Sequence, residues 1–297
     1  MNNVLVAIKC LVYNHEPYIR ECLEGFVMQK TNFKFVAVVH DDASTDDTAS
    51  IIKEYAEKYP EIIKPIFEKE NQYSKKDGSL RRIMTDAIDA TRAKYVAMCE
   101  GDDYWIDPYK LQKQVDFMEE NICVVACCHN AFQVFENERR LFVNVNNASH
   151  YIVLEEMLCR WQIPTASLLY RREILKGKEC LLGKYVNGDY ALELTLLSCG
   201  RFYYDDSIMS VYRMHADSVS ANLNKRQTMM YSQIIKLLDD AKRLYMENDY
   251  KYFDNAINNY KTLIIETTLL NHPLKKWFNR KTYTRWLKKK VIKILNR

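Results

Sequence analysis

The order of apolar runs along the chain is the feature that most limits its fold. Four runs are apolar almost throughout, as in strands buried on both faces of a sheet: 4–12, 33–40, 62–67 and 94–99. Segments with helical spacing of apolar residues, or with the start signal of a helix, separate these runs: 18–28, from Thr48 onward, and 80–91. This alternation predicts an α/β fold, with a mostly parallel sheet and helices on both of its faces.

Acidic clusters follow two of the predicted strands directly. Residues 41–47 contain four aspartates, and residues 100–103 read Glu-Gly-Asp-Asp. In parallel sheets, ligands bind at the carboxyl ends of the strands. Carboxylates so close together repel one another unless a cation neutralises them, and oxygen ligands of this kind suit Mg²⁺ or Mn²⁺ shared with substrate phosphates. We therefore expect a phosphate ligand and a divalent cation at this edge of the sheet.

The second half of the chain is less regular. Strands are predicted at 124–128, 140–145 and 167–170, a short helix at 154–160, and a hairpin from 201–205 and 208–213. Asp189 lies at the start of a further predicted helix, and everything after about residue 224 has a helical pattern. We therefore predict two domains: residues 1–221 with the sheet, and residues 222–297 as a helical C-terminal region.

Composition excludes several other kinds of protein. There are only 7 glycines, where an average chain of this length has roughly 20, and no glycine-rich phosphate loop motif occurs. The nine cysteines are scattered and are interpreted as reduced core thiols. A zinc site at 123–129 is disfavoured, because Cys127 and Cys128 would point to opposite faces of a strand. No signal peptide and no membrane-spanning run is recognised, so we expect a cytoplasmic protein.

Four motifs together resemble glycosyltransferase family 2, whose members have the Rossmann-like GT-A fold. They are Val12-Tyr13-Asn14, similar to a T-Y-N turn; residues 39–48, similar to V-D-D-G-S-T-D-x-T; residues 100–114, similar to the D-x-D region and the helix after it; and residues 211–220, similar to Y-R-x-H-x-x-S-x-S. Ala43 replaces the usual glycine, and Glu100 replaces the usual first aspartate. The motifs occur in the family's order and cover about residues 4–220.

The resemblance implies a nucleotide-diphospho-sugar donor and Mn²⁺ or Mg²⁺. Nucleotide contacts are implied for Val12, Asn14, Asp41, Asp42, Arg82 and Asp102, with Arg81 as an alternative to Arg82. Asp41 would accept a hydrogen bond from the N3–H of uracil or thymine, since an ionised carboxylate can only accept, and Asp102 would contact the ribose. Asp103 would bind the metal, with His215 as a further ligand or a diphosphate contact.

The resemblance also implies a catalytic base. Asp189 stands in the matching Asn-Gly-Asp-Tyr segment, and Glu193, one turn later, is a weaker alternative. The structural alternative for Asp189 is a helix N-cap. The remaining candidates contact the acceptor or donor: Glu100, Tyr104, Trp105 and Arg213 in the pocket, Ser218 at a phosphate, and residues 161–167 near the acceptor.

The end of the chain is strongly basic. Residues 273–297 contain ten Lys or Arg and no acid, which leaves residues 1–272 with a net charge of −6. Aromatic and aliphatic side chains from Tyr283 to Leu295 share one helical face, and most lysines lie off it. This pattern favours an interfacial helix on anionic lipid, at the cytoplasmic face of the membrane. Docking on the acidic body is the alternative, and nucleic acid is not expected as a partner.

Together these expectations describe an inverting, metal-dependent glycosyltransferase. It would move a sugar, with UDP as the favoured carrier, to a hydroxyl of a glycan or lipid-linked acceptor in surface polysaccharide or glycolipid synthesis. Two alternatives stay open. One is a sugar nucleotidyltransferase, which usually has a glycine-rich loop after its first strand. The other is a non-catalytic GT-A-like binding or scaffold protein.

Overall fold

The computed structural model describes residues 3–135, 138–143, 148–159, 163–178, 181–185, 187–215 and 227–271. The first half contains β1 (Val4–Val12), α1 (Ile19–Val27), β2 (Lys34–Asp41), α2 (Thr48–Lys58), β3 (Ile63–Phe67), α3 (Gln72–Lys75), α4 (Ser79–Ala90) and β4 (Tyr95–Met98). The middle contains β5 (Tyr104–Trp105), α5 (Lys110–Glu120), β6 (Val124–Phe135), β7 (Glu138–Leu141), β8 (His150–Ile152), α6 (Leu154–Cys159), η1 (Thr165–Ser167), β9 (Leu169–Arg171) and η2 (Arg172–Leu175). The last part contains α7 (Gly188–Leu197), β10 (Arg201–Met214), α9 (Gln227–Ala241), η3 (Lys242–Leu244), η4 (Glu247–Asp249) and α10 (Tyr250–Asn271).

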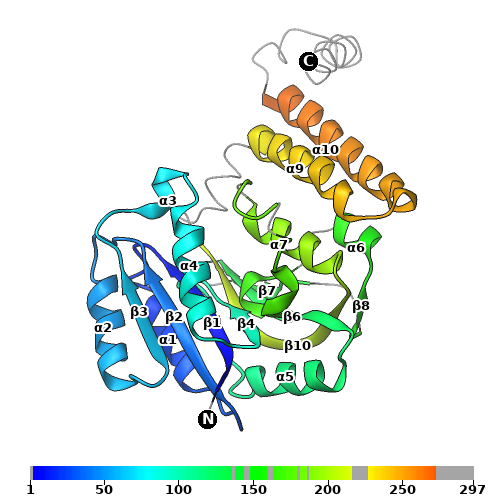
Figure 1. Ribbon diagram of the computed structural model, residues 1–297. Coiled ribbons are helices and arrows are strands. Elements are labelled where there is room, and N and C mark those ends of the chain that lie inside the picture. Colours follow the sequence, from blue (N-terminus) through cyan, green and yellow to red (C-terminus); the bar gives the residue numbers. More distant parts are fainter. Residues whose placement is uncertain are drawn as a thin grey trace.

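The ten strands that the structure describes form one mixed sheet. Its main order is β3-β2-β1-β4-β9-β6-β10-β5, with β7 beside β6 and β8 beside β10. The strands β1, β2, β3 and β4 run parallel to their neighbours in this group, and β9 is antiparallel to both β4 and β6. The predicted α/β fold with a Rossmann-like sheet is therefore confirmed, with β1 to β4 parallel in the first half of the chain and β6 parallel to β10 in the second (Figure 1).

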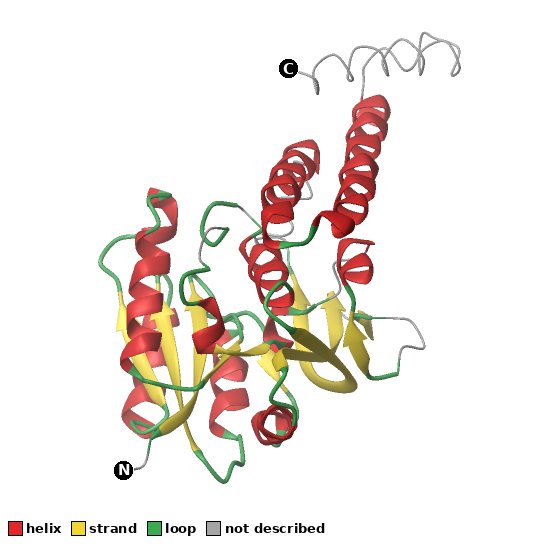
Figure 2. Ribbon diagram, turned by 45° about the vertical axis from the view of Figure 1, so that its right-hand side comes forward, coloured by secondary structure: helices red, strands yellow, loops and turns green. Residues whose placement is uncertain are grey.

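Apolar clusters cover both faces of the sheet. On one face, α1, α2 and α5 contribute buried side chains such as Phe26, Ile52 and Leu111. On the other face, α4 and α7 contribute side chains that include Met84 and Leu194 (Figure 2). Cys127 belongs to the first cluster and Cys128 to the second, so these two neighbours do point to opposite faces of β6.

The C-terminal helices extend the second of these clusters. The helices α9 and α10 lie side by side in both views, above α7 and α6 (Figures 1 and 2). Leu237, Leu238 and Phe253 are completely buried and belong to the same apolar cluster as α7. The predicted boundary at 221/222 and the basic segment 273–297 lie outside the described residues. No helix among the described residues has both the length and the apolar character needed to cross a membrane.

Three predicted elements differ from the structure. The expected hairpin of 201–205 and 208–213 is wrong: β10 is one long strand that runs parallel to β6. The polar residues Asp205, Asp206 and Ser207 are accommodated where the register with β6 shifts, as in a bulge, and not at a turn. The strand expected at 140–145 is β7, which ends at Leu141. The strand expected at 167–170 begins at Leu169, after the single 3₁₀ turn η1.

Candidate active site

Asn14 ties the turn after β1 to the turn after β2. Its backbone is left-handed, with a φ of 54°, which Asn adopts more readily than most residues. The Asn14 N–H donates to Ser44 Oγ at 2.9 Å, and Asn14 Oδ1 accepts from the Thr45 N–H at 2.8 Å. Ala43 also has a left-handed φ, of 61°, so the backbone shape expected for a glycine is kept. Val12, the last residue of β1, is buried directly before this turn.

The two aspartates after β2 have different surroundings. Asp41 is 2% exposed, its Oδ2 accepts from the Ser44 N–H at 3.3 Å, and its buried Oδ1 has no partner among the described residues. Burial raises the pKa of Asp41 above its usual value. Asp42 uses both oxygens to accept the N–H groups of Gln72, at 2.6 Å, and Tyr73, at 3.0 Å. Asp42 therefore anchors α3, whereas Asp41 keeps a buried oxygen without a partner among the described residues.

A glycine brings the acidic loop after β4 against the β1 turn. The Gly101 N–H donates to the Leu11 carbonyl oxygen at 3.0 Å. A Cβ atom at Gly101 would lie 2.8 Å from His15 Nδ1 and 2.9 Å from a methyl group of Val12, closer than real Cβ atoms approach their neighbours. Only glycine fits this contact, and it places Asp102 beside His15.

Asp102 lies between two histidines. His215 Nε2 is 3.1 Å from Asp102 Oδ2, and His15 Nε2 is 4.0 Å from the same oxygen. Asp102 Oδ1 is buried and has no partner among the described residues. Burial raises the pKa of Asp102, but the hydrogen bond with His215 and the positive charges of His15 and His215 outweigh burial and lower the pKa overall. Asp102 is therefore held ionised, with one free acceptor atom.

Asp103 uses only one of its two oxygens in the protein, because its buried Oδ2 has no partner among the described residues. It is 1% exposed, and its Oδ1 accepts from the backbone N–H of Arg213 at 2.9 Å. Burial, followed by the charge of Asp102, raises the pKa of Asp103 well above its usual range. The carboxylate that faces His215 is Asp102, because Asp103 is directed to the backbone of β10. The geometry thus favours Asp102 over Asp103 as the partner of His215.

The two aromatic residues of β5 point to opposite sides of the strand. The prediction that Trp105 lines a pocket is wrong: it is 1% exposed, its ring packs 5.0 Å from the Phe26 ring centroid, and its indole N–H donates to the Ala166 carbonyl oxygen at 2.8 Å. Tyr104 is partly exposed, and the guanidinium of Arg213 lies 4.2 Å from its ring centroid. Tyr104 and Arg213 therefore remain at the surface of the site.

The two arginines at the start of α4 differ in direction. Arg82 donates to the Asp77 carbonyl oxygen at 3.4 Å, in the loop before the helix. Arg81 packs at Gly183. Burial lowers the pKa of Lys9 on β1, and the nearby charge of Arg81 adds to that lowering. Arg81 is therefore the arginine on the side of the site that contains Lys9.

Asp189 lies in the first turn of α7, and Asn187 occupies the N-cap position of that helix. Asp189 Oδ2 accepts a hydrogen bond from Thr165 Oγ1 at 3.0 Å, and the side chain remains partly exposed. Burial raises the pKa of Asp189, while the Thr165 hydrogen bond and the positive charge of Lys9 act in the opposite direction. Glu193, the alternative base, is completely buried. Of the two carboxylates, only Asp189 is accessible.

A lysine and a second carboxylate complete this side of the site. Lys9 is half-buried in the central strand β1, on the same side of the strand as Ala7. Its electrostatic partners are Asp189 and Glu100. Burial, and then the charges of Asp189 and Asp102, raise the pKa of Glu100 well above its usual range. The positive charge of Lys9 is therefore near both Asp189 and Glu100, and it reduces the repulsion between these two carboxylates.

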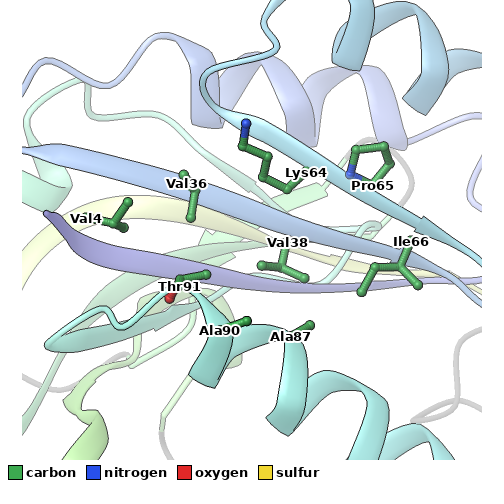
Figure 3. Close-up of a pocket in the computed structure, with 9 residues that line it drawn as sticks. All are labelled: Val4, Val36, Val38, Lys64, Pro65, Ile66, Ala87, Ala90 and Thr91. Atoms are coloured by element: carbon green, nitrogen blue, oxygen red, sulfur yellow. The ribbon is translucent and has the colours of Figure 1, made fainter. Parts of the chain in front are cut away.

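Two hollows lie near the parallel strands. One, of about 540 Å³, is beside Asp41 and is also lined by Ser44, Lys53 and Phe67. The other, of about 440 Å³, lies between the sheet and α4 and is lined mainly by apolar side chains such as Val38 and Ile66 (Figure 3). None of the acidic site residues lines the second hollow, so only the first adjoins the site.

Two residues of the site were not predicted from the sequence. His15 directly follows Asn14, so its place in the turn was a usable signal. Lys9 is a single charge within an apolar strand, which is also unusual enough to notice. Thr165 lies in the range 161–167 expected near the acceptor, but its contact with Asp189 was not predicted, because η1 reaches Asp189 only through the fold. Ser218 and Trp161 lie outside the described residues.

A divalent cation fits the residues around Asp102. The unpartnered Asp102 Oδ1 is a hard oxygen donor next to an imidazole, and Mn²⁺ accepts both. Within the described ranges, however, no three side chains of His, Cys, Asp or Glu are arranged as a complete metal site. A cation here would therefore need ligands from the substrate as well as from the protein.

The family of the chain follows from its sequence. The sequence model of glycosyl transferase family 2 matches residues 10–176, which is more than half of the chain, and this chain belongs to that family. The uncharacterized protein Rv1520 of Mycobacterium tuberculosis is 33% identical over 226 residues, which are 75% of this chain and 63% of that protein. The glucosyltransferase WfaP of Escherichia coli, named as using UDP-Glc and an α-D-GlcNAc-diphosphoundecaprenol acceptor, is 28% identical over 78% of this chain and 86% of its own length.

Solved structures agree on the fold. The TarS protein of Staphylococcus aureus, determined with UDP-GlcNAc, has a TM-score of 0.68 at 16% identity, over 94% of this chain and 77% of that one. The mannosyltransferase PcManGT of Pyrobaculum calidifontis, determined with GDP-Man and Mn²⁺, has a TM-score of 0.53 at 14% identity, over 98% and 87% of the two chains. At these identities the likeness establishes the GT-A fold alone.

Proposed function

We propose that this chain is an inverting, metal-dependent glycosyltransferase that moves a sugar from a UDP-sugar to a hydroxyl of a glycan or lipid-linked acceptor. The observation that carries the proposal is the pairing of two acidic groups with different surroundings: Asp102 with His215, and Asp189 with Thr165. Membership of family 2 and the UDP-sugar named for WfaP and TarS support it. Surface polysaccharide or glycolipid synthesis is the proposed setting.

On the nucleotide side, the free oxygen of Asp41 would accept the N3–H of uracil, because a carboxylate offers only acceptors. Asp102 and His215 would hold Mn²⁺ or Mg²⁺, and Arg81 or Arg213 would face the phosphates. The bound cation would supply charge stabilisation to the departing diphosphate. Asp103, assigned first to the metal, would keep β10 and the acidic loop together through the Arg213 N–H, and its unpartnered Oδ2 makes it the second candidate ligand after Asp102.

On the sugar side, Asp189 would act as general base. The acceptor oxygen attacks the anomeric carbon as the bond from that carbon to the diphosphate oxygen breaks, and the hydroxyl proton goes to Asp189. Thr165 occupies one carboxylate oxygen, which leaves the other for this proton. Lys9, near both Asp189 and Glu100, would help to keep the base ionised despite burial.

The direct test is release of UDP from UDP-Glc and UDP-GlcNAc in the presence of Mn²⁺, with and without a panel of glycan acceptors. We expect turnover that depends on the metal and is lost on Asp189→Asn. Metal-dependent UDP binding without any turnover would instead support a binding protein, and production of a nucleotide-sugar from a sugar phosphate and UTP would support a nucleotidyltransferase.

For residues 273–297 we propose attachment to an anionic membrane surface, based on the basic and apolar faces of that segment. Deletion of these residues should abolish sedimentation with vesicles that contain phosphatidylglycerol. Added salt should weaken binding of the full chain to the same vesicles, because the attraction is partly electrostatic. Equal sedimentation by the truncated and the full chain would refute the attachment.

A further inference from the structure

The 3₁₀ turn η1 is held by side chains from two directions. On one side, Thr165 donates to Asp189 at 3.0 Å. On the other side, the Ala166 carbonyl oxygen accepts from the Trp105 indole at 2.8 Å, and the Ser167 carbonyl oxygen accepts from the Gln114 amide at 2.9 Å. The turn that carries the partner of Asp189 is therefore fixed by the segment that follows the acidic loop.

A completely buried lysine lies behind these contacts. Lys110 is 0% exposed, its Nζ donates to Gln114 Oε1 at 2.7 Å, and it lies 4.2 Å from the Trp105 ring centroid. No ion pair joins it to a carboxylate of the described residues. Lysine is almost never fully buried unless it is paired, because burial removes the hydration of its charge. Its closest polar and aromatic contacts are the two side chains that hold η1.

Lys110 also determines how the Gln114 amide is oriented. The Lys110 amino group donates to the amide oxygen of Gln114, which fixes that end of the amide. The NH₂ group is then directed to the Ser167 carbonyl oxygen, where a donor is needed. With the amide reversed, two oxygens would face each other at Ser167. The i, i+4 spacing of Lys110 and Gln114 on the buried face of α5 makes this arrangement possible.

We propose that Lys110 and Gln114 are positioning residues for the catalytic base, which act by fixing η1 so that the Thr165 hydroxyl stays on Asp189. This inference rests on the proposed role of Asp189. In this proposal α5, the helix after the acidic loop, helps to position the catalytic base, in addition to packing against one face of the sheet.

A merely structural role and a positioning role predict different results. Replacing a buried polar pair with apolar side chains of similar size is often neutral or stabilising for the fold. A structural pair would therefore leave turnover unchanged once it is replaced. A positioning pair would lower turnover although the fold is as stable as before.

The experiment uses the full chain with the substitutions Lys110→Met and Gln114→Leu together. We expect a melting temperature close to that of the wild type, because removal of the buried Lys110 charge offsets the loss of the donor to the Ser167 carbonyl oxygen, and an unchanged Kd for UDP with Mn²⁺. UDP release from UDP-GlcNAc or UDP-Glc should fall about tenfold, as for the loss of a hydrogen bond to a charged group. The acidic limb of the pH profile should move to higher pH, because Thr165 no longer lowers the pKa of Asp189. The outward-facing pair Gln112→Leu with Lys113→Met is the matched control and should keep wild-type turnover.

The substitution Thr165→Val tests whether Lys110 and Gln114 act through Thr165. If Lys110 and Gln114 act through Thr165, adding their substitutions to Thr165→Val should cause little further loss, whereas independent effects would multiply. Unchanged turnover and an unchanged acidic limb in the double variant would overturn the inference. If that variant does not fold, Gln114→Glu still accepts from Lys110 but cannot donate to Ser167. It should show the same loss, and wild-type turnover in this variant would also overturn the inference.

Failure of the proposed function gives a separate result. If Asp189→Asn and Thr165→Val both turn over as the wild type does, the assignment of the base is wrong. If those two lower turnover and the Lys110 and Gln114 substitutions do not, only the positioning inference is wrong.

Discussion

The proposed nucleotide side and the proposed sugar side of the site differ in how many of their polar side-chain atoms already have a partner in the protein. On the nucleotide side, Asp41, Asp102 and Asp103 each keep a buried oxygen without a partner among the described residues. On the sugar side, the buried Asn187 Oδ1 also has no partner there, but Asp189 is held by Thr165, and the turn that carries Thr165 is held by Gln114 and Trp105.

Buried polar atoms without partners are rare in folded proteins and call for a ligand or water. We therefore expect the unpartnered carboxylate oxygens of the nucleotide side to contact polar groups of the substrate or a bound cation. The sugar side is already connected to the protein, as expected for a group that must keep one orientation through the reaction. Substitutions on the two sides should consequently affect binding and turnover separately.

The largest effect is expected for Asp189→Asn, which keeps the shape of the side chain but cannot accept the acceptor proton. General bases typically contribute about 10² to 10⁴ in rate. UDP release in the presence of acceptor should fall by about this range, measured by steady-state kinetics. Wild-type turnover would remove Asp189 from the reaction, and Asn187→Ala at the N-cap position serves as a control for disturbance of α7.

The next effect is expected for Asp102→Asn on the nucleotide side. Loss of the charge beside His215 should weaken Mn²⁺-dependent UDP binding by tenfold or more, or about 1.4 kcal/mol. Calorimetric titration of UDP with and without Mn²⁺ measures this. Asp103→Asn is the informative comparison, because it should lower the melting temperature through β10 more than it weakens binding. The reverse ranking would restore Asp103 as the metal ligand.

A smaller effect is expected for Thr165→Val. Burial already raises the pKa of Asp189, and the Thr165 hydrogen bond opposes that rise. A base is active only when ionised, so turnover is lost as the pH falls through this pKa. Without the hydroxyl the pKa rises further, and the acidic limb should move upward by about one unit. A limb that stays in place, measured over pH 4–8, would show that Thr165 does not tune the base.

The last effect concerns stability and leaves the reaction itself aside. Burial lowers the pKa of Lys110 from 10.5 to about 7, with the charges of Cys127, Cys99 and Asp107 acting against this. Between pH 7 and 10.5 the unfolded chain holds a proton that the folded chain lacks, so stability rises with pH, by about 1.4 kcal/mol per unit.

Urea unfolding at pH 7 and pH 9 can detect this contribution of Lys110 to the free energy of unfolding. The wild type should gain roughly 2 kcal/mol relative to the Lys110→Met, Gln114→Leu variant between these pH values. A constant difference between the two proteins would mean that Lys110 stays charged, or stays neutral, over the whole interval.

The candidate residues of the nucleotide side could be identified from the sequence because most of them directly follow a predicted strand. Asp41, Ala43 and the 100–103 loop each leave a strand that the apolar pattern identifies, and the topology brings these strand ends together. What the pattern left undecided was which of two adjacent carboxylates faces the ligand. That choice depends on Gln72 and Tyr73 for Asp42, and on the Arg213 N–H for Asp103, which lie far away in the sequence.

The sugar side was predicted less completely for the same reason. Asp189 was a candidate through a motif, but Thr165 contacts it only through the fold, and Gln114 and Lys110 reach η1 through packing of β5 and α5. Trp105 shows how a local pattern can mislead: an aromatic residue after an acidic loop suggests a sugar platform, yet strand alternation turns it into the core.

The most direct measurement is a comparison of UDP affinity and turnover in two variants, Asp102→Asn and Asp189→Asn, in one buffer with Mn²⁺. We predict that Asp102→Asn loses UDP affinity, and that Asp189→Asn keeps wild-type affinity while its turnover falls by about 10² or more. If Asp189→Asn loses affinity and turnover together, or if Asp102→Asn binds UDP as the wild type does, the division of the site into a binding side and a reacting side is wrong.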